Sequence, residues 1–129
     1  MGRSFGGRAA VDLAATEGAR GLILVSTFTA MPDVGARSVP LLPVHSIMQY
    51  RLDSKSKIAD YHGPLLQCHG DADRVISYDI GRELFDSANE PKQFVPISGG
   101  THNDPLPIEF HRALDAFLAG LPEPKREPQ

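Results

Sequence analysis

Ser4 lies in the pattern G-x-S-x-G at the start of the chain, in the run Gly2-Arg3-Ser4-Phe5-Gly6. The pattern is typical of a nucleophile elbow, a strained strand-to-helix turn that projects a serine hydroxyl into a site. A plain turn at a helix start explains the same residues, so the motif alone leaves both interpretations open. A phosphate cradle at the helix amides is a third and weaker interpretation, because the lysine of a Walker motif is missing.

Asp73 follows an apolar run at 64–70, in the sequence His69-Gly70-Asp71-Ala72-Asp73. An aspartate just past a strand can accept a hydrogen bond from an imidazole and fix its tautomer. Local turn chemistry is the alternative, since Asp is common in turns. A metal site made of His69, Asp71 and Asp73 is less favoured, because a fourth ligand and a recognised metal spacing are both missing. We therefore predict no metal.

His102 lies in a glycine-rich loop, Gly99-Gly100-Thr101-His102-Asn103-Asp104, between an expected strand and the last expected helix. A histidine in such a loop can act as a general base. The alternative is a polar loop in which Asp104 caps the following helix.

The remaining nucleophilic and titratable residues favour structural roles. Cys68 falls within an apolar run and is expected to be a buried thiol. As the single cysteine, it excludes a disulfide framework and a multi-cysteine zinc site. His45 and His62 are expected at the surface or in capping roles, and His111 is expected to be exposed.

Alternating helices and short apolar strands must position these residues. Continuous apolar runs predict buried strands at 21–27, 64–70 and 93–97. Helices are expected at 8–17 and 78–88, and a last helix carries the apolar stripe Phe110, Ala113, Leu114, Phe117 and Leu118. The alternation predicts an α/β fold in three layers, with a short, mainly parallel sheet flanked by helices.

The geometry of such a sheet predicts where the chemistry gathers. Sites in parallel sheets lie beyond the carboxyl ends of the strands, which selects residues 26–27, 69–77 and 98–104. The opening turn at 2–7 joins them if a strand precedes it. Pro96 cannot donate to a strand ladder, so the strand at 93–97 is expected at the outside of the sheet. Residues 28–63 are expected to form short helices and loops.

The chain order of the three motifs is more specific than any one of them. A serine on an elbow, an acid after a later strand and a histidine after the last strand follow the order Ser…Asp…His of α/β-hydrolases. The sequence resembles that superfamily over nearly its whole length except the tail. The likeness is greatest to the α/β-hydrolase-domain and serine-aminopeptidase-like serine hydrolases. Besides the three motifs, it rests on the strand Leu22-Ile23-Leu24-Val25-Ser26-Thr27-Phe28.

The resemblance implies a serine hydrolase that needs no cofactor. Ser4 is then the nucleophile, His102 the general base and Asp73 the acid. The family pattern H-G-x-x-D-x-x-V selects Asp73 over Asp71. The backbone amide of Phe5 is expected to supply one oxyanion donor. The expected substrate is a small-molecule ester, thioester or amide, cleaved through an acyl-enzyme.

The chain departs from the family by beginning at the elbow. A complete member has eight strands, and only strands six, seven and eight are expected here, so residues 1–121 correspond to the C-terminal portion of a hydrolase domain. The second oxyanion donor of the family comes from a loop after strand three. The chain is therefore expected to be truncated and to be weakly active or inactive. The strand at 21–27 is expected to be an unpaired apolar edge that invites self-association. A non-catalytic domain that binds a partner through this edge is the alternative function.

Composition restricts the class of protein further. The 129 residues carry 13 Lys and Arg against 16 Asp and Glu, a net charge of −3, with 41% hydrophobic residues. These proportions are typical of one globular domain, and they argue against a nucleic acid partner or an anionic membrane surface. No apolar run is long enough to cross a bilayer, and no signal peptide is visible. We expect a cytoplasmic location for this chain and a disordered tail at 122–129.

Overall fold

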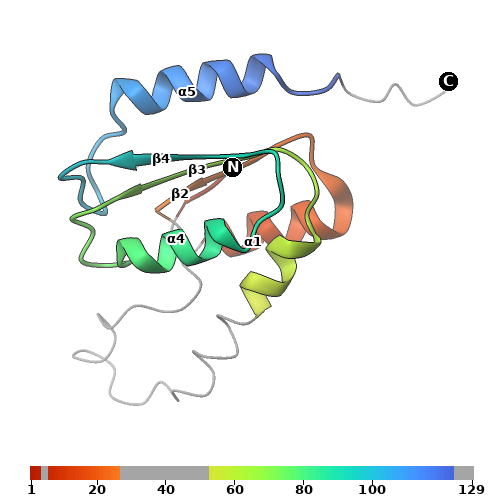
Figure 1. Cartoon of the computed structure of the whole chain (residues 1–129), viewed down its shortest axis with the longest axis horizontal. Helices are drawn as coiled ribbons and strands as arrows, with labels where there is room; N and C mark the ends of the chain where they lie inside the picture. The colour runs from red at the N-terminus through yellow and green to blue at the C-terminus, as the bar shows by residue number, and fades with distance from the viewer. Residues whose placement is uncertain (4–5, 27–52, 124–129) are drawn as a thin grey trace, which may run out of the picture.

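A sheet of four parallel strands forms the centre of the computed structural model, which describes residues 1–3, 6–26 and 53–123 (Figure 1). The strands lie side by side in chain order: β1 (Gly2–Arg3), β2 (Leu22–Val25), β3 (Leu65–Gly70) and β4 (Lys92–Ile97). All three pairings are parallel. The predicted α/β class, with a short parallel sheet between helices, is confirmed.

Helices cover both faces of the sheet (Figure 1). On one face lie α1 (Gly6–Leu13), α4 (Tyr78–Asp86) and the helical residues 53–60. On the other face lies α5 (Ile108–Ala119). The predicted single helix at 8–17 is instead two elements, because α1 ends at Leu13 and passes into a π-helical turn, η1 (Ala14–Gly18). Gly18 ends this turn with a φ of 73°, a left-handed conformation that favours glycine.

β2 is a continuous apolar run because helices cover both faces of the sheet at this strand. Alternate residues of β2 point to opposite faces, and all four are buried. One core lies beneath α1, α4 and the helical residues 53–60, and it includes Leu22, Leu24, Ile58, Leu65, Leu84 and Phe85. The other core lies beneath α5, and it consists of Ile23, Val25, Leu66, Cys68 and Phe110.

The apolar stripe of α5 faces the second core as predicted, except at its last residue. Phe110 is fully buried, and Ala113, Leu114 and Phe117 pack against its core. Leu118 is 49% exposed, so the prediction that it packs with the stripe is wrong. At 3.6 residues per turn, Leu118 lies about 80° around the helix from Phe110, at the margin of the stripe.

The opening segment differs from the predicted turn at 2–7. Gly2 and Arg3 form a short strand that pairs with Leu24 and Val25 of β2. The prediction that the strand at 21–27 presents a wholly unpaired edge is therefore wrong, and the described residues contribute four strands to the sheet rather than three. Gly2 is needed here because a Cβ at this position would lie 2.6 Å from the Cα of Gly7 in α1.

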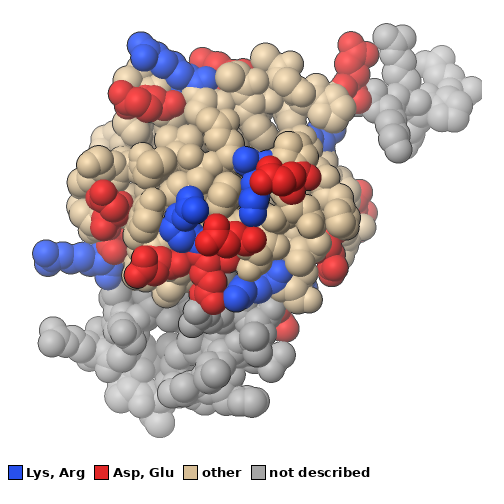
Figure 2. All heavy atoms as spheres, viewed as in Figure 1, with Lys and Arg blue, Asp and Glu red and all other residues tan. Residues whose placement is uncertain are grey.

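The other sequence predictions divide between confirmed boundaries and segments outside the described residues. The predicted strands at 64–70 and 93–97 are β3 and β4, and Pro96 lies in β4, which pairs only with β3 among the described strands. Residues 27–52 and 124–129, which include His45 and most of the expected tail, lie outside the described residues. On the face shown in Figure 2, acidic and basic side chains are interspersed. No helix in the described part of the chain is both long and apolar enough to cross a bilayer.

Candidate active site

The loops after β3 and β4 meet at the carboxyl ends of these strands. The Asp71 carboxylate accepts a hydrogen bond from the Gly99 amide at 2.7 Å, and the Ala72 amide donates to the Gly100 carbonyl at 3.1 Å. Gly70 allows this approach, since a Cβ there would lie 2.1 Å from the Gly100 carbonyl oxygen. The two loops are therefore joined by one side-chain and one backbone hydrogen bond.

Asp73 is held in one orientation by the turn that it begins. Its Oδ1 accepts hydrogen bonds from the amides of Val75 and Ile76, both at 2.8 Å. The side chain has no exposed surface. Two amide donors on one oxygen leave the other oxygen, Oδ2, for a different partner.

That partner is His102. Its Nδ1 lies 2.9 Å from Asp73 Oδ2, and its side chain retains 13% exposure. Because a carboxylate only accepts hydrogen bonds, Nδ1 carries the proton in the neutral ring, which leaves Nε2 as a base. Asp71 instead contacts the Gly99 amide. Of the two aspartates, Asp73 is thus the one that contacts His102.

The His102 loop is also fixed by its neighbours. The Thr101 amide donates to Asp104 Oδ2 at 2.7 Å, and this hydrogen bond lowers the pKa of the Asp104 carboxyl. Arg3, the last residue of β1, donates from Nη2 to the His102 carbonyl at 3.3 Å. The end of β1 therefore adjoins the histidine loop.

A hollow of about 350 Å³ opens beside His102. Its lining comes from both loops and consists of Ala72, Arg74, Val75, Thr101, His102 and Asn103. Arg74 carries a formal charge, and the other described lining residues are uncharged when His102 is neutral. A small organic group fits a hollow of this size and has the imidazole within reach.

His69 is a site residue whose role the sequence reasoning missed. It is fully buried on β3, and its Nε2 lies 2.8 Å from the Ile76 carbonyl and 3.4 Å from Asp73 Oδ2. Burial lowers the pKa of this imidazole below its usual value. Its place in the motif His69-Gly70-Asp71-Ala72-Asp73, with Asp73 four residues later, was the one available signal.

The structure does not combine His69, Asp71 and Asp73 as metal ligands. Asp71 is directed to the Gly99 amide, whereas His69 and Asp73 lie together beneath the loop. Within residues 1–3, 6–26 and 53–123, no group of three or more His, Cys, Asp or Glu side chains is arranged to hold a metal ion.

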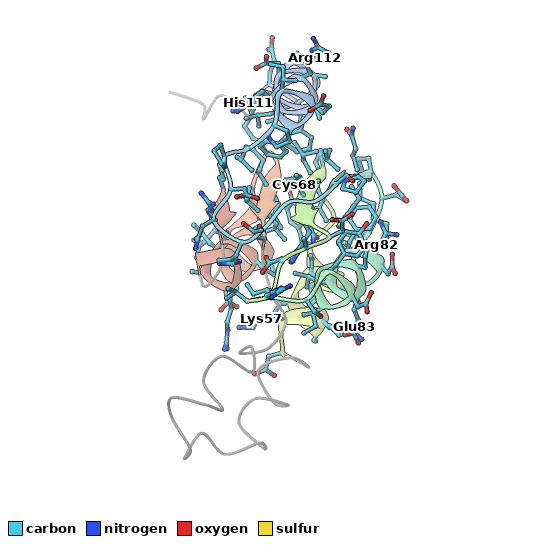
Figure 3. The ribbon with its side chains drawn as sticks, turned by 90° about the vertical axis from the view of Figure 1, so that its left-hand side faces the viewer. Lys57, Cys68, Arg82, Glu83, His111 and Arg112 are labelled. Carbon is cyan, nitrogen blue, oxygen red and sulfur yellow. The ribbon has the colours of Figure 1, made fainter. Side chains whose placement is uncertain are left out.

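Ser4 and Phe5 lie outside the described residues, but both of their neighbours are placed. Arg3 ends β1 and contacts the His102 loop, and Gly6 begins α1. Three of the remaining candidates, Cys68, His62 and His111, have the environments expected of them. Cys68 lies within the sheet, where burial raises the pKa of its thiol to about 12 (Figure 3). His62 and His111 are exposed.

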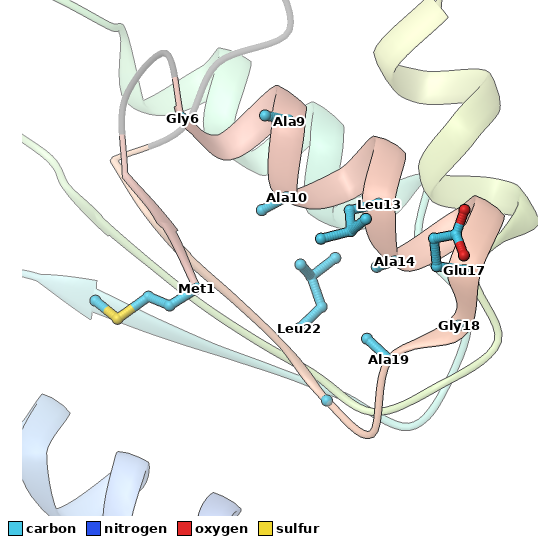
Figure 4. Close-up of a pocket in the computed structure, with 11 residues that line it drawn as sticks. Met1, Gly6, Ala9, Ala10, Leu13, Ala14, Glu17, Gly18, Ala19 and Leu22 are labelled. Atoms are coloured by element: carbon cyan, nitrogen blue, oxygen red, sulfur yellow. The ribbon is translucent and has the colours of Figure 1, made fainter.

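A second hollow, of about 450 Å³, lies at the β1 side of the sheet (Figure 4). Its lining is largely apolar and comes from α1, η1, the start of β2 and the N-terminal residue. Two side chains that border it are unusually exposed for their type, Met1 at 69% and Leu13 at 62%.

Comparison with curated proteins gives relatives of unknown activity. No protein-family model matches the chain. An uncharacterized protein of Mycobacterium tuberculosis is 34% identical over 123 residues, which cover 95% of this chain and 44% of the relative. The uncharacterized protein YfhR of Escherichia coli is 34% identical over 111 residues, which cover 81% of this chain and 37% of the relative. The chain therefore spans less than half the length of these curated relatives.

Solved structures with a similar fold include lipases and esterases. A monoacylglycerol lipase of Paleococcus ferrophilus matches with a TM-score of 0.70 and 18% identity, over 92% of this chain and 66% of that one. An esterase from Rhodococcus matches with a TM-score of 0.70 and 17% identity, over 94% and 64%. The ferulic acid complex of Est1E from Butyrivibrio proteoclasticus matches with a TM-score of 0.68 and 21% identity, over 92% and 57%. The chain therefore has part of the α/β fold of these esterases and lipases.

Proposed function

We propose that the chain carries the machinery of a serine hydrolase, with Ser4 as nucleophile, His102 as general base and Asp73 as the acid that orients it. The observation that carries the proposal is the contact between His102 Nδ1 and buried Asp73 Oδ2, at 2.9 Å, beside a hollow. The position of Arg3 and Gly6 on either side of Ser4 and Phe5 supports it, because Arg3 ends a strand that contacts the histidine loop.

The proposed reaction is an acyl transfer in two steps. The Ser4 Oγ attacks the carbonyl carbon of an ester, thioester or amide while His102 Nε2 takes the hydroxyl proton. The imidazolium then donates this proton to the leaving oxygen, sulfur or nitrogen, and an acyl-enzyme remains. Water attacks the acyl-enzyme in the same way, which releases the acid and restores Ser4.

The supporting residues lower the barrier in different ways. Asp73 keeps the His102 proton on Nδ1 and stabilises the imidazolium. The Phe5 amide is proposed as one donor to the tetrahedral oxyanion, an interaction that typically contributes a factor of about a hundred to a thousand in rate. The substrate is proposed to be a small-molecule acyl compound, part of which lies in the hollow beside His102.

A fluorophosphonate probe tests the proposal, because only an activated serine reacts with it at a useful rate. We expect weak labelling of the purified chain, with the adduct on the peptide that contains Ser4, and loss of this labelling in Ser4→Ala. Ser87→Ala is the matched control, since the Ser87 hydroxyl is bound to the Glu83 carbonyl on α4. His102→Gln is expected to abolish labelling, whereas His111→Gln, at an exposed position of α5, leaves it unchanged.

Turnover of an activated ester, such as p-nitrophenyl acetate, gives the second readout. Turnover that depends on both Ser4 and His102 supports the proposal. A chain that is folded by circular dichroism but neither labels nor turns over the ester contradicts it. Labelling that survives Ser4→Ala contradicts the assignment of the nucleophile.

A second candidate function is a non-catalytic domain that pairs with another copy of this chain along β1. The largely apolar hollow at this edge favours it, since exposed Met1 and Leu13 lie at its margin. Edge strands and contiguous apolar surface commonly mark association sites. The probe separates the two candidates, because association alone gives no serine labelling.

A further inference from the structure

His69 is buried directly beneath the Asp73–His102 pair, and the proposed reaction has no task for it. It lies on β3 with no exposed surface. Its Nε2 is 2.8 Å from the Ile76 carbonyl oxygen and 3.4 Å from Asp73 Oδ2. Burying an imidazole is unfavourable unless its polar atoms find partners, so these contacts require an explanation.

The partners of His69 determine its tautomer. A carbonyl only accepts hydrogen bonds, so Nε2 must carry the proton and donate it to Ile76. Nδ1 has no hydrogen-bond partner among the described residues. The ring is therefore a neutral donor whose single N–H is aimed at the Ile76 carbonyl, with Asp73 Oδ2 as its nearest carboxylate oxygen.

Ile76 connects His69 to Asp73 through both of its backbone groups. Its carbonyl accepts from His69, and its amide donates to Asp73 Oδ1 at 2.8 Å. His69 thus holds Ile76 in place, and Ile76 in turn holds the Asp73 carboxylate. A shift of Ile76 would move Asp73 Oδ1, and with it the Oδ2 atom that contacts His102.

Gly81 on α4 makes the space that the ring occupies. A Cβ at this position would lie 2.3 Å from His69 Nδ1 and 2.9 Å from the neighbouring ring carbons. The helix is held against the ring because Gln67, two residues before His69 on β3, donates to the Gly81 carbonyl at 2.7 Å. A side chain at 81 would displace the ring from Ile76.

We propose that His69 is a positioning residue for the candidate active site. Its ring occupies the space that Gly81 leaves, and its Nε2–H keeps Asp73 aligned with His102. The proposal rests on the proposed function for its effect on catalysis. Its structural part, the alignment of Asp73 with His102, is measurable without any turnover.

The decisive comparison is between His69→Gln and His69→Met. The two side chains are unbranched and similar in length, but only glutamine offers an N–H donor to the Ile76 carbonyl. Nitrogen-15 NMR of the His102 ring reports which nitrogen carries the proton. We expect the Nδ1–H form in the wild type and in His69→Gln, and loss of this preference in His69→Met.

Ester turnover gives the second readout. For His69→Met we expect kcat to fall by about tenfold to a hundredfold, since a misplacement of about 1 Å can reduce the rate about a hundredfold. KM is expected to stay unchanged, because no residue that lines the hollow beside His102 is altered. His69→Gln is expected to restore most of the lost kcat.

Gly81→Ala tests the same contact from the helix. It is expected to reproduce the His102 signature of His69→Met, whereas Gly120→Ala does not, because its nearest neighbour would be 3.5 Å away. If Gly81→Ala fails to fold, the double variant His69→Ala/Gly81→Ala is expected to fold, since removal of the ring leaves room for the methyl group.

The outcomes separate the inference from the proposed function. A wild type that turns over no ester contradicts the proposed function, while the NMR comparison still decides the alignment. Equal His102 signals in His69→Gln and His69→Met overturn the inference, because the ring would then only fill space. A Gly81→Ala variant with wild-type His102 signals overturns it as well.

Discussion

Replacement of Asp73 by asparagine tests the candidate site most directly. The amide oxygen of the new side chain can replace Oδ1 and accept the same two hydrogen bonds, from the amides of Val75 and Ile76 at 2.8 Å. The amide nitrogen then takes the place of Oδ2, where His102 Nδ1 lies at 2.9 Å. Because this nitrogen donates, His102 must accept at Nδ1 and carry its proton on Nε2. The base is then blocked while the turn stays intact.

The expected loss is large for activity and small for stability. The wrong histidine tautomer lowers kcat about ten-thousandfold in a well-studied serine protease. That factor corresponds to about 5 kcal/mol of activation free energy. Since both backbone hydrogen bonds are retained, we expect the Tm to change by no more than about 5 °C.

Asp71→Asn is the matched control for this experiment. Asp71 is exposed and accepts one hydrogen bond, from the Gly99 amide, which an asparagine oxygen accepts equally well. We expect fluorophosphonate labelling and ester turnover close to wild type in Asp71→Asn, and near background in Asp73→Asn. If Asp71→Asn causes the greater loss, or if both variants lose activity equally, the assignment of Asp73 is refuted.

Three further predictions concern stability, reactivity and association. Burial lowers the pKa of His69 below 6.5, so as the pH falls through this value the unfolded chain binds a proton that the native chain does not, and the free energy of unfolding decreases. Urea unfolding at about pH 5 and about pH 7 should show that the free energy of unfolding decreases less in His69→Gln than in the wild type. The same decrease in both proteins would contradict the lowered pKa of His69. Burial raises the pKa of Cys68 to about 12, so a disulfide reagent should react with this thiol in urea but not in the native protein. Leu13 is 62% exposed beside the hollow at β1, so Leu13→Glu should lower the sedimentation-average mass if copies associate there, whereas an exposed-leucine control on α5, Leu118→Glu, should not.

The sequence alone predicted β2, β3, β4 and the helices α1, α4 and α5, together with the order of the chemical motifs. The strands β3 and β4 were predictable because each is a short apolar run followed by turn residues, a local signal. The face of α5 followed from the spacing of Phe110, Ala113, Leu114 and Phe117, and failed only at Leu118, on the margin of the stripe. The preference for Asp73 over Asp71 came from the resemblance to a family. The catalytic roles of Ser4, Asp73 and His102 stay predictions.

The tertiary structure decided which of these groups touch. Propensity and periodicity describe residues near one another in the chain, whereas the contact of Asp73 with His102 joins positions 29 apart. The pairing of Gly2 with Leu24 likewise depends on how the first helix packs on the sheet, so the sequence reasoning missed β1. In the sequence His69 is only one residue of a motif. Its role depends on its hydrogen bond to the Ile76 carbonyl and on the space at Gly81, two features of packing. A local pattern can place a histidine on a buried strand, but only the packed helix and turn determine what its proton binds.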